Sequence, residues 1–222
     1  MRARLSVLAL LSACNGVLGL EERTFDLCTQ YCDAIQNSCV QANAQYQDDA
    51  TCRATCALFE AGDADDPTGN TIACRFDQLK KAEEAGTLDE ICPAAGPGGF
   101  NRSSLQVCGN RCETYCSLMK STCDGKSPVA DLDDESCRSL CGDVRDNPAY
   151  DPTNSDVKDH DDSIQCRLWH LSVASTAPDP HCSHADGATK CDGNLSSSSA
   201  TTSSASSSAS TGGGVGGGGG GS

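Results

Sequence analysis

The sequence predicts a mainly α-helical protein made of two small units in tandem, each cross-linked by disulfide bonds. Among its 222 residues are 17 cysteines but only one Trp, four Tyr and four Phe, and the spacing of the cysteines repeats. Cysteine at this density is typical of exported proteins in an oxidising compartment, where disulfide bonds replace part of a large apolar core. Acidic residues outnumber basic ones by 31 to 16. We therefore expect no nucleic-acid partner.

The first residues have the form of a signal peptide. A short basic start precedes an apolar run over residues 5–13, which is shorter than the roughly 20 residues of a membrane-spanning helix. The sequence Leu-Ser-Ala-Cys, ending at Cys14, matches a bacterial lipobox, in which residues 1–13 are removed and Cys14 is lipidated. Ordinary signal cleavage, which removes residues 1–19, is the alternative. Both routes take Cys14 out of the disulfide pool and leave sixteen cysteines, an even number that allows complete pairing.

These sixteen cysteines form two sets of eight with similar spacing. The intervening lengths are 3, 6, 12, 3, 17, 17 and 15 residues in the first set and 3, 6, 13, 3, 24, 15 and 8 in the second. The sequences Asp-Asp-x-x-Cys-Arg and Ile-x-Cys-Arg recur at the same places in both sets. We interpret residues 28–108 and 109–191 as two copies of one module, preceded by a tether over residues 14–27.

The remaining residues, 192–222, form a tail of low complexity. From residue 196 onward the tail contains only Ser, Gly, Thr, Ala and one Val. Such a composition cannot bury enough apolar surface to offset the entropy of ordering, so we expect a disordered spacer.

Two helices of each unit are predicted by cysteine spacing. Cys28, Cys32 and Cys39 lie at i, i+4 and i+11, which is one stripe of a helix, and the second set repeats this pattern. A second helix carries the next i, i+4 pair and follows an Asp pair at 48–49 or 133–134, which suits a helix N-terminus. When two helices with such pairs pack antiparallel, we expect the outer cysteine of one pair to bond to the outer cysteine of the other, and the inner cysteine to the inner one. The predicted bridges are Cys28–Cys56 with Cys32–Cys52, and Cys112–Cys141 with Cys116–Cys137.

A third helix is predicted to begin near residue 71 and end at Gly86, and in the second unit to begin near residue 163 and end at Pro178. The other cysteines of each unit allow three pairings. We favour Cys39–Cys74 with Cys92–Cys108, because the span that corresponds to Cys92–Cys108 in the second unit is short. Cys39–Cys92 is the alternative. The equivalent cysteines of the second unit are Cys123, Cys166, Cys182 and Cys191.

Motifs of catalysis are absent from the sequence. No Cys-x-x-Cys, Gly-x-Ser-x-Gly or His-Glu-x-x-His occurs, so we expect neither thiol redox chemistry nor a hydrolase, and we predict that the protein is not an enzyme. Two acidic loops, around residues 63–66 and 151–162, are candidate calcium sites. They lack the Gly and Glu positions of an EF-hand loop.

Three histidines late in the second unit form a candidate zinc site. His181 and His184 have a spacing that suits two metal ligands, and His170 is the third donor. The first unit has Gln78, Ile91 and Ala94 at the corresponding positions, so the site would belong to one unit only.

Several segments resemble a known class of proteins. The start Cys-Asn-Gly-Val-Leu-Gly-Leu-Glu-Glu-Arg at residues 14–23, the pair Cys28-x-x-x-Cys32, Cys-Arg-Leu-Trp-His at 166–170 and His-Cys-Ser-His-Ala at 181–185 are similar to uncharacterised cysteine-rich, predicted lipoproteins of Gram-negative bacteria. The resemblance covers residues 14–191. The first unit departs from it with Cys-Arg-Phe-Asp-Gln and Ile-Cys-Pro-Ala-Ala. The resemblance implies an outer-membrane or cell-surface lipoprotein with a helical fold, and it implies no activity.

These observations predict an exported, lipid-anchored, non-enzymatic surface module that either binds an unknown ligand or acts as a spacer. Its partner would be a protein or a glycan, and its lipid anchor would be its only contact with a membrane. A zinc site at His170, His181 and His184, with a sequestering or catalytic role, is the second hypothesis. A purely structural envelope protein is the third, and a secreted protein without lipid is the alternative localisation.

Overall fold

The computed structural model of this protein describes residues 26–101, 103 and 105–193, and the fold in this part is mainly helical as predicted. Residues 26–38 form the first helix. Extended pairing among the described residues is limited to two isolated bridges, Glu60 with Thr71 and Phe100 with Gln106. The other helices are η1 (Gln41–Asn43), α2 (Asp49–Cys56), α3 (Ile72–Ala85), α4 (Leu88–Ala95), α5 (Arg111–Cys123), α6 (Asp134–Asp143), α7 (Ser155–His160), α8 (Ile164–Ala174) and α9 (Pro178–Ala185).

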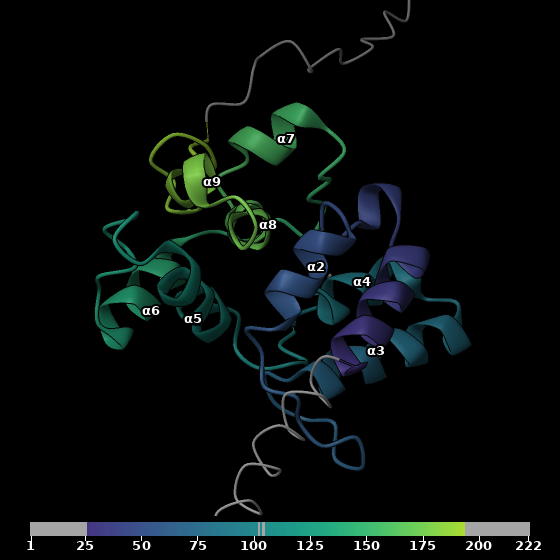
Figure 1. The fold of residues 1–222 in the computed structure, drawn as a ribbon. Coiled ribbons are helices and arrows are strands. Elements are labelled where there is room, and N and C mark those ends of the chain that lie inside the picture. Colours follow the sequence, from purple (N-terminus) through teal and green to yellow (C-terminus); the bar gives the residue numbers. More distant parts are fainter. Residues whose placement is uncertain (1–25, 102, 104, 194–222) are drawn as a thin grey trace, which may run out of the picture.

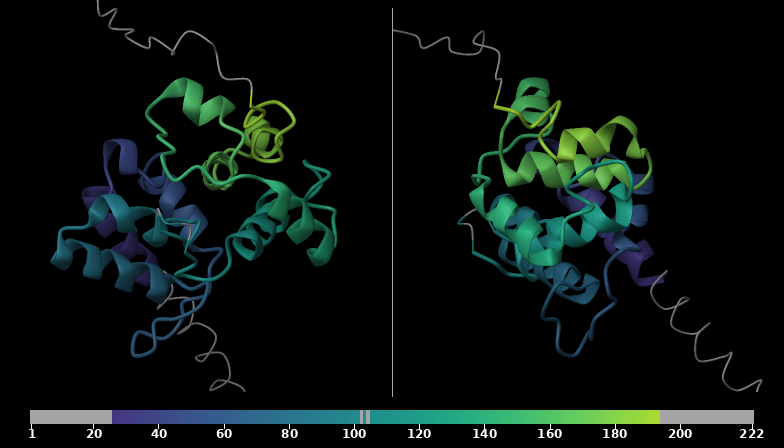
Figure 2. Two further views of the ribbon diagram at one scale, coloured as in Figure 1. Left: turned by 180° about the vertical axis from the view of Figure 1, so that it is seen from behind. Right: turned by 90° about the vertical axis from the view of Figure 1, so that its left-hand side faces the viewer.

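The helices gather in two groups that follow the two halves of the sequence. Figure 1 shows helix 26–38, α2, α3 and α4 on one side and α5, α6, α8 and α9 on the other. The view from behind in Figure 2 shows the same division. Helix α8 contacts α5, α7 and α9 of its own half and α2 of the other half, so it lies at the junction of the two groups.

Disulfide bonds cross-link the helices of each half. Two bridges join helix 26–38 to α2, and two join α5 to α6, in the pairs that antiparallel helices predict. These bridges are Cys28–Cys56, Cys32–Cys52, Cys112–Cys141 and Cys116–Cys137.

The pairing that we favoured for the other cysteines is wrong. Cys182 lies within α9, which packs against both α8 and α5, so its sulfur reaches the end of α5 and not the nearby Cys191. Helix α4 carries Cys92 to the end of helix 26–38 in the same way, which is the alternative pairing. The structure joins Cys39 to Cys92, Cys74 to Cys108, Cys123 to Cys182 and Cys166 to Cys191.

The two halves therefore have one connectivity. Numbered along each half, the first cysteine pairs with the fifth, the second with the fourth, the third with the seventh and the sixth with the eighth. Two further contacts recur in both halves. A buried tyrosine hydroxyl donates to the carbonyl oxygen of the last residue of α4 or α9. The arginine that follows the sixth cysteine donates to the carbonyl oxygen of the residue just after that helix. The pairs are Tyr31 with Ala95, Tyr115 with Ala185, Arg75 with Gly96 and Arg167 with Asp186.

Capping side chains start the helices where the sequence predicts. Asp48 and Asp133 accept hydrogen bonds from the backbone N–H groups of Thr51 and Ser136, each at 2.8 Å. Thr71 and Ser163 cap α3 and α8 through their hydroxyl oxygens. Each of these oxygens satisfies a backbone N–H that has no partner within its own helix.

The ends of the third helices differ from the prediction in one case. Gly86 terminates α3 with a left-handed backbone (φ +67°), as glycine permits. Helix α8 already ends at Ala174, and Pro178 begins α9, because the fixed φ angle of proline suits the first turn of a helix. The sequence does not predict α4, α7 or α9.

Polar contacts join the two halves in addition to apolar packing. The hydroxyl of Thr55 on α2 donates to the carbonyl oxygen of Ser172 on α8 at 3.2 Å. The hydroxyl of Thr114 on α5 donates to the side-chain oxygen of Asn70 at 3.0 Å. Both halves contribute residues to one buried cluster, among them Ile35 and Leu79 in the first half and Met119 in the second.

Several predictions lie outside the described residues. They concern the signal peptide, the lipidated Cys14, the tether except for residues 26–27, and the tail except for residues 192–193. In the part of the chain that the structure describes, no helix combines the length and apolar character needed to cross a membrane. Eight disulfide bonds indicate folding in an oxidising compartment.

Candidate metal centre

Three histidines meet where α8 and α9 pack against each other. His170 lies on α8, and His181 and His184 lie three residues apart on α9, which places them on the same face of that helix. A three-residue turn folds α9 back onto α8, and the Cys123–Cys182 bridge fixes α9 to α5. The structure thus brings together the three side chains that the sequence singles out.

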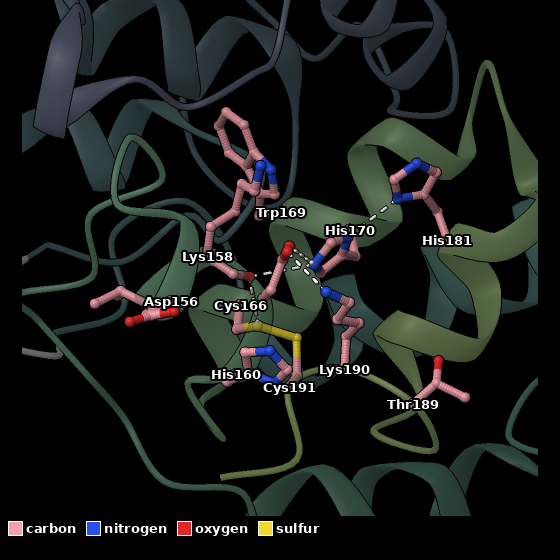
Figure 3. Close-up of polar contacts among 12 residues, drawn as sticks. Asp156, Lys158, His160, Cys166, Trp169, His170, His181, Thr189, Lys190 and Cys191 are labelled. Carbon is pink, nitrogen blue, oxygen red and sulfur yellow. Dashed lines mark hydrogen bonds and ion pairs between the residues drawn. A yellow bond between two sulfur atoms is a disulfide. The ribbon is translucent and has the colours of Figure 1, made fainter. Parts of the chain in front are cut away.

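The three imidazole rings are close enough to share one ion. The ring centroids of His170 and His181 are 5.3 Å apart, and those of His184 are 4.8 Å from His170 and 5.2 Å from His181. One nitrogen from each ring lies within 4.8 Å of the others. His170 Nδ1 and His181 Nδ1, which face each other in Figure 3, are 3.1 Å apart. Two imidazole nitrogens on one tetrahedral zinc ion are roughly 3.3 Å apart, given Zn–N bonds of about 2.0–2.1 Å.

The hydrogen bonds of His170 assign its tautomer. Its Nε2 lies 3.2 Å from the carbonyl oxygen of Lys158, and because a carbonyl only accepts, Nε2 carries the proton. Nδ1 of the neutral ring then accepts the hydrogen bond from Nδ1 of His181, so its electron pair is directed at that ring. Asp159, which accepts from Lys190 at 2.8 Å, lies 3.7 Å from the same Nε2. Metal-binding histidines commonly have such a carbonyl or carboxylate partner on the nitrogen that does not bind the metal.

Burial keeps the three rings neutral. The side chain of His170 is 3% exposed, and burial, together with the neighbouring His184 and His181, lowers its pKa to about 3. Burial also lowers the pKa values of His181 and His184. Neutral imidazole is the form that binds a metal, so no proton has to leave this site at neutral pH.

His184 adds a further sign that a partner belongs here. Its Nδ1 is buried and has no hydrogen-bond partner among the described residues. A buried polar atom without a partner costs free energy, and a bound cation would supply the missing interaction. The donor set, three imidazoles with no thiolate, suits zinc and also Cu²⁺ or Ni²⁺.

The sequence did not indicate the groups that support His170. Lys158 and Asp159 lie in α7, a short helix with no counterpart among the helices described in the first half. The signal was the longer interval between the fifth and sixth cysteines, 24 residues against 17. Interval lengths alone do not show that the inserted helix packs on α8 beside the histidines.

Other candidate ligands do not come together as metal sites. The sulfur atoms of Cys166 and Cys191 lie within 4.8 Å of a His170 nitrogen, but they are bonded to each other and provide no thiolate. In the two acidic loops, Asp63 accepts from the backbone of Asp65, and Asp151 accepts from Thr153. Farther along the second loop, Asp159 and Asp161 form ion pairs with Lys190 and Arg145. The described residues form two clusters of potential metal ligands, and neither cluster contains a residue of these loops.

Comparison with protein-family models, with curated proteins and with solved structures finds no match to this chain.

Proposed function

We propose that this protein is an exported, lipid-anchored module of two related helical units, and that its second unit binds a divalent transition metal, foremost zinc. The role that we propose is non-enzymatic, namely holding or sequestering the metal at the cell surface. The observation that carries the proposal is the convergence of His170, His181 and His184, with one nitrogen of each ring within 4.8 Å of the others.

Comparison of the two halves supports this reading. The halves share one bridge connectivity and the same tyrosine and arginine contacts, which is what duplication of one module predicts. At the three histidine positions the first half has Gln78, Ile91 and Ala94, which are ordinary packing residues. Since the scaffold folds with either set, the histidines are not required by the packing of the third and fourth helices.

A metal titration tests the site. Zinc added to protein that was stripped with a chelator should bind at one equivalent per chain and raise the melting temperature, since a ligand at 100 times its Kd adds about 2.7 kcal/mol to the free energy of unfolding. The variant H170Q/H181I/H184A introduces the residues of the first half, so we expect it to fold and to lose this binding. His160→Gln, which removes the fourth histidine, is the matched control. Equal zinc binding by the triple variant and the wild type would refute the metal site.

The lipid anchor has a separate test. Intact mass of the mature protein should show a chain that begins at a lipidated Cys14, and reduction should release sixteen thiols and no others. A lipid-free chain that begins at Leu20 would contradict the anchor and leave the metal site untouched.

A further inference from the structure

We propose that a pocket between the two halves binds a neutral sugar ring, either a free monosaccharide or the end of a glycan. One wall comes from the loops around η1 and after α4, and the other comes from the loop at 147–150 and from α8. The ligand would thus touch both halves. This inference does not depend on the metal site. His170 of that site directly follows Trp169 of the pocket in α8.

The lining differs from the rest of this acidic protein. Fifteen described residues line the pocket and none of them carries a charge, although 21% of the chain is charged. A pocket without charge does not favour an ionic ligand, because neither sign of charge would find a partner there. The ligand class is therefore uncharged.

The polar groups in the pocket are side-chain amides. Five Asn and Gln residues line it, among them Gln45, Asn147 and Gln165. An amide both donates and accepts hydrogen bonds, and a sugar hydroxyl needs a partner of that kind. Gln165 accepts from the backbone N–H of Asn147 at 2.9 Å, and its Nε2 is buried without a partner among the described residues. Because Gln165 lines the pocket, we assign this Nε2 as the donor to a ligand oxygen.

Aromatic side chains supply the apolar surface. Phe100 comes from the first half, and Tyr150 and Trp169 come from the second. The C–H face of a pyranose ring can pack against such rings while its hydroxyls reach the amides. Trp169 is the single Trp of the chain and is 8% exposed, so all Trp emission comes from a residue that lines this pocket.

The size of the pocket limits the ligand. The enclosed cavity has a volume of about 50 Å³, and the empty space that includes its open mouth is about 570 Å³. Only one sugar residue can enter, and part of it stays in the mouth. A free monosaccharide and the terminal residue of a glycan meet the same groups, and their affinities distinguish these two sources.

The test is a fluorescence titration of the full mature chain in the presence of a chelator, so that its result does not depend on bound metal. The probes are methyl glycosides of neutral hexoses and N-acetylhexosamines, neutral oligosaccharides, and methyl glucuronide as a charged comparison. We expect a saturable change in Trp169 emission with a neutral sugar and a weaker response to the glucuronide. Tighter binding of the oligosaccharide would identify a glycan end as the ligand.

Two matched variants locate the interaction. Gln165→Leu removes the unpartnered donor and should weaken binding about five- to tenfold, the equivalent of one hydrogen bond. Gln36→Leu removes another buried Nε2 without a partner, away from the pocket, and should leave binding unchanged. Protection of Trp169 from oxidation by the sugar gives a readout on the wild type that does not depend on either variant folding.

Two outcomes would overturn the proposal. They are the absence of a saturable response to every neutral sugar, and equal weakening of binding by both variants.

Discussion

At the scale of single residues, the four tyrosines share an unusual titration. Burial raises the pKa of Tyr46 and of Tyr115 to about 12. Burial, with the neighbouring Tyr46 in one case and Asp161 in the other, also raises the pKa values of Tyr31 and Tyr150. These are all the tyrosines of the chain. We expect little phenolate absorbance at 295 nm at pH 11 in the folded protein, and ordinary ionisation near pH 10 after reduction and denaturation.

The same shifts set the alkaline stability. Because the pKa values of the tyrosines are higher in the folded state, the tyrosines contribute to the free energy of unfolding. This contribution is fully present below about pH 10 and is lost as the pH rises through about 12. The free energy of unfolding should therefore fall over this window. A rapid pH jump, followed before the disulfide bonds react with base, measures this change. Phenolate formation near pH 10 in the native protein would contradict the buried positions.

Arg75 is a second case in which one residue matters. Its fully buried guanidinium donates to the carbonyl oxygens of Gly96, Pro97 and Thr71 and lies 3.9 Å from the centre of the Phe59 ring. Arg75→Met leaves these carbonyls without their donor, so we expect a loss of about 3 kcal/mol in chemical denaturation, since hydrogen bonds to charged groups contribute about 1.5–3 kcal/mol each. The exposed Arg138→Met should change stability little. Equal losses in both variants would mean that the carbonyl contacts do not stabilise the fold.

At the scale of elements, the disulfide bond between the end of helix 26–38 and α4 should contribute strongly to the free energy of unfolding. Cys39 and Cys92 are 53 residues apart in the sequence, and the chain-entropy relation assigns such a loop about 4 kcal/mol of stabilisation. The double variant C39A/C92A should lose about this amount in urea denaturation. Peptide mapping of the wild type should recover Cys39 joined to Cys92, and recovery of Cys39 joined to Cys74 would contradict this connectivity.

The elements also show what a sequence can predict. Helix 26–38, α2, α5 and α6 follow from i, i+4 cysteine pairs and Asp caps, which are local signals. Helix α4 is missed because Pro93 lies inside it, and α9 because Pro178 is typical of a helix end as well as of a helix start. The partner of Cys39 depends on how α4 packs on α3, which is a tertiary contact. The histidines were predictable as residues, but their support by the carbonyl of Lys158 was not.

At the scale of the whole molecule, the bridges should be decisive for stability. Each half has few large apolar side chains, and a domain of that size has a marginal core without cross-links. We expect excess reductant at moderate temperature to abolish the helical circular dichroism signal, because four bridges of about 2–4 kcal/mol each are lost from each half. A reduced protein that keeps its helical spectrum would show that packing alone maintains the fold.

The bridge order has a consequence for cleavage by proteases. Within each half the bridges overlap, so every peptide bond from Cys28 to Cys108 and from Cys112 to Cys191 lies under at least one of them. A single cut in either interval leaves the fragments covalently attached to each other. No bridge among the described residues spans 109–111, so one cut in these three residues divides the chain into two separately cross-linked pieces. Those pieces would then remain together only through contacts such as that of Thr114 with Asn70.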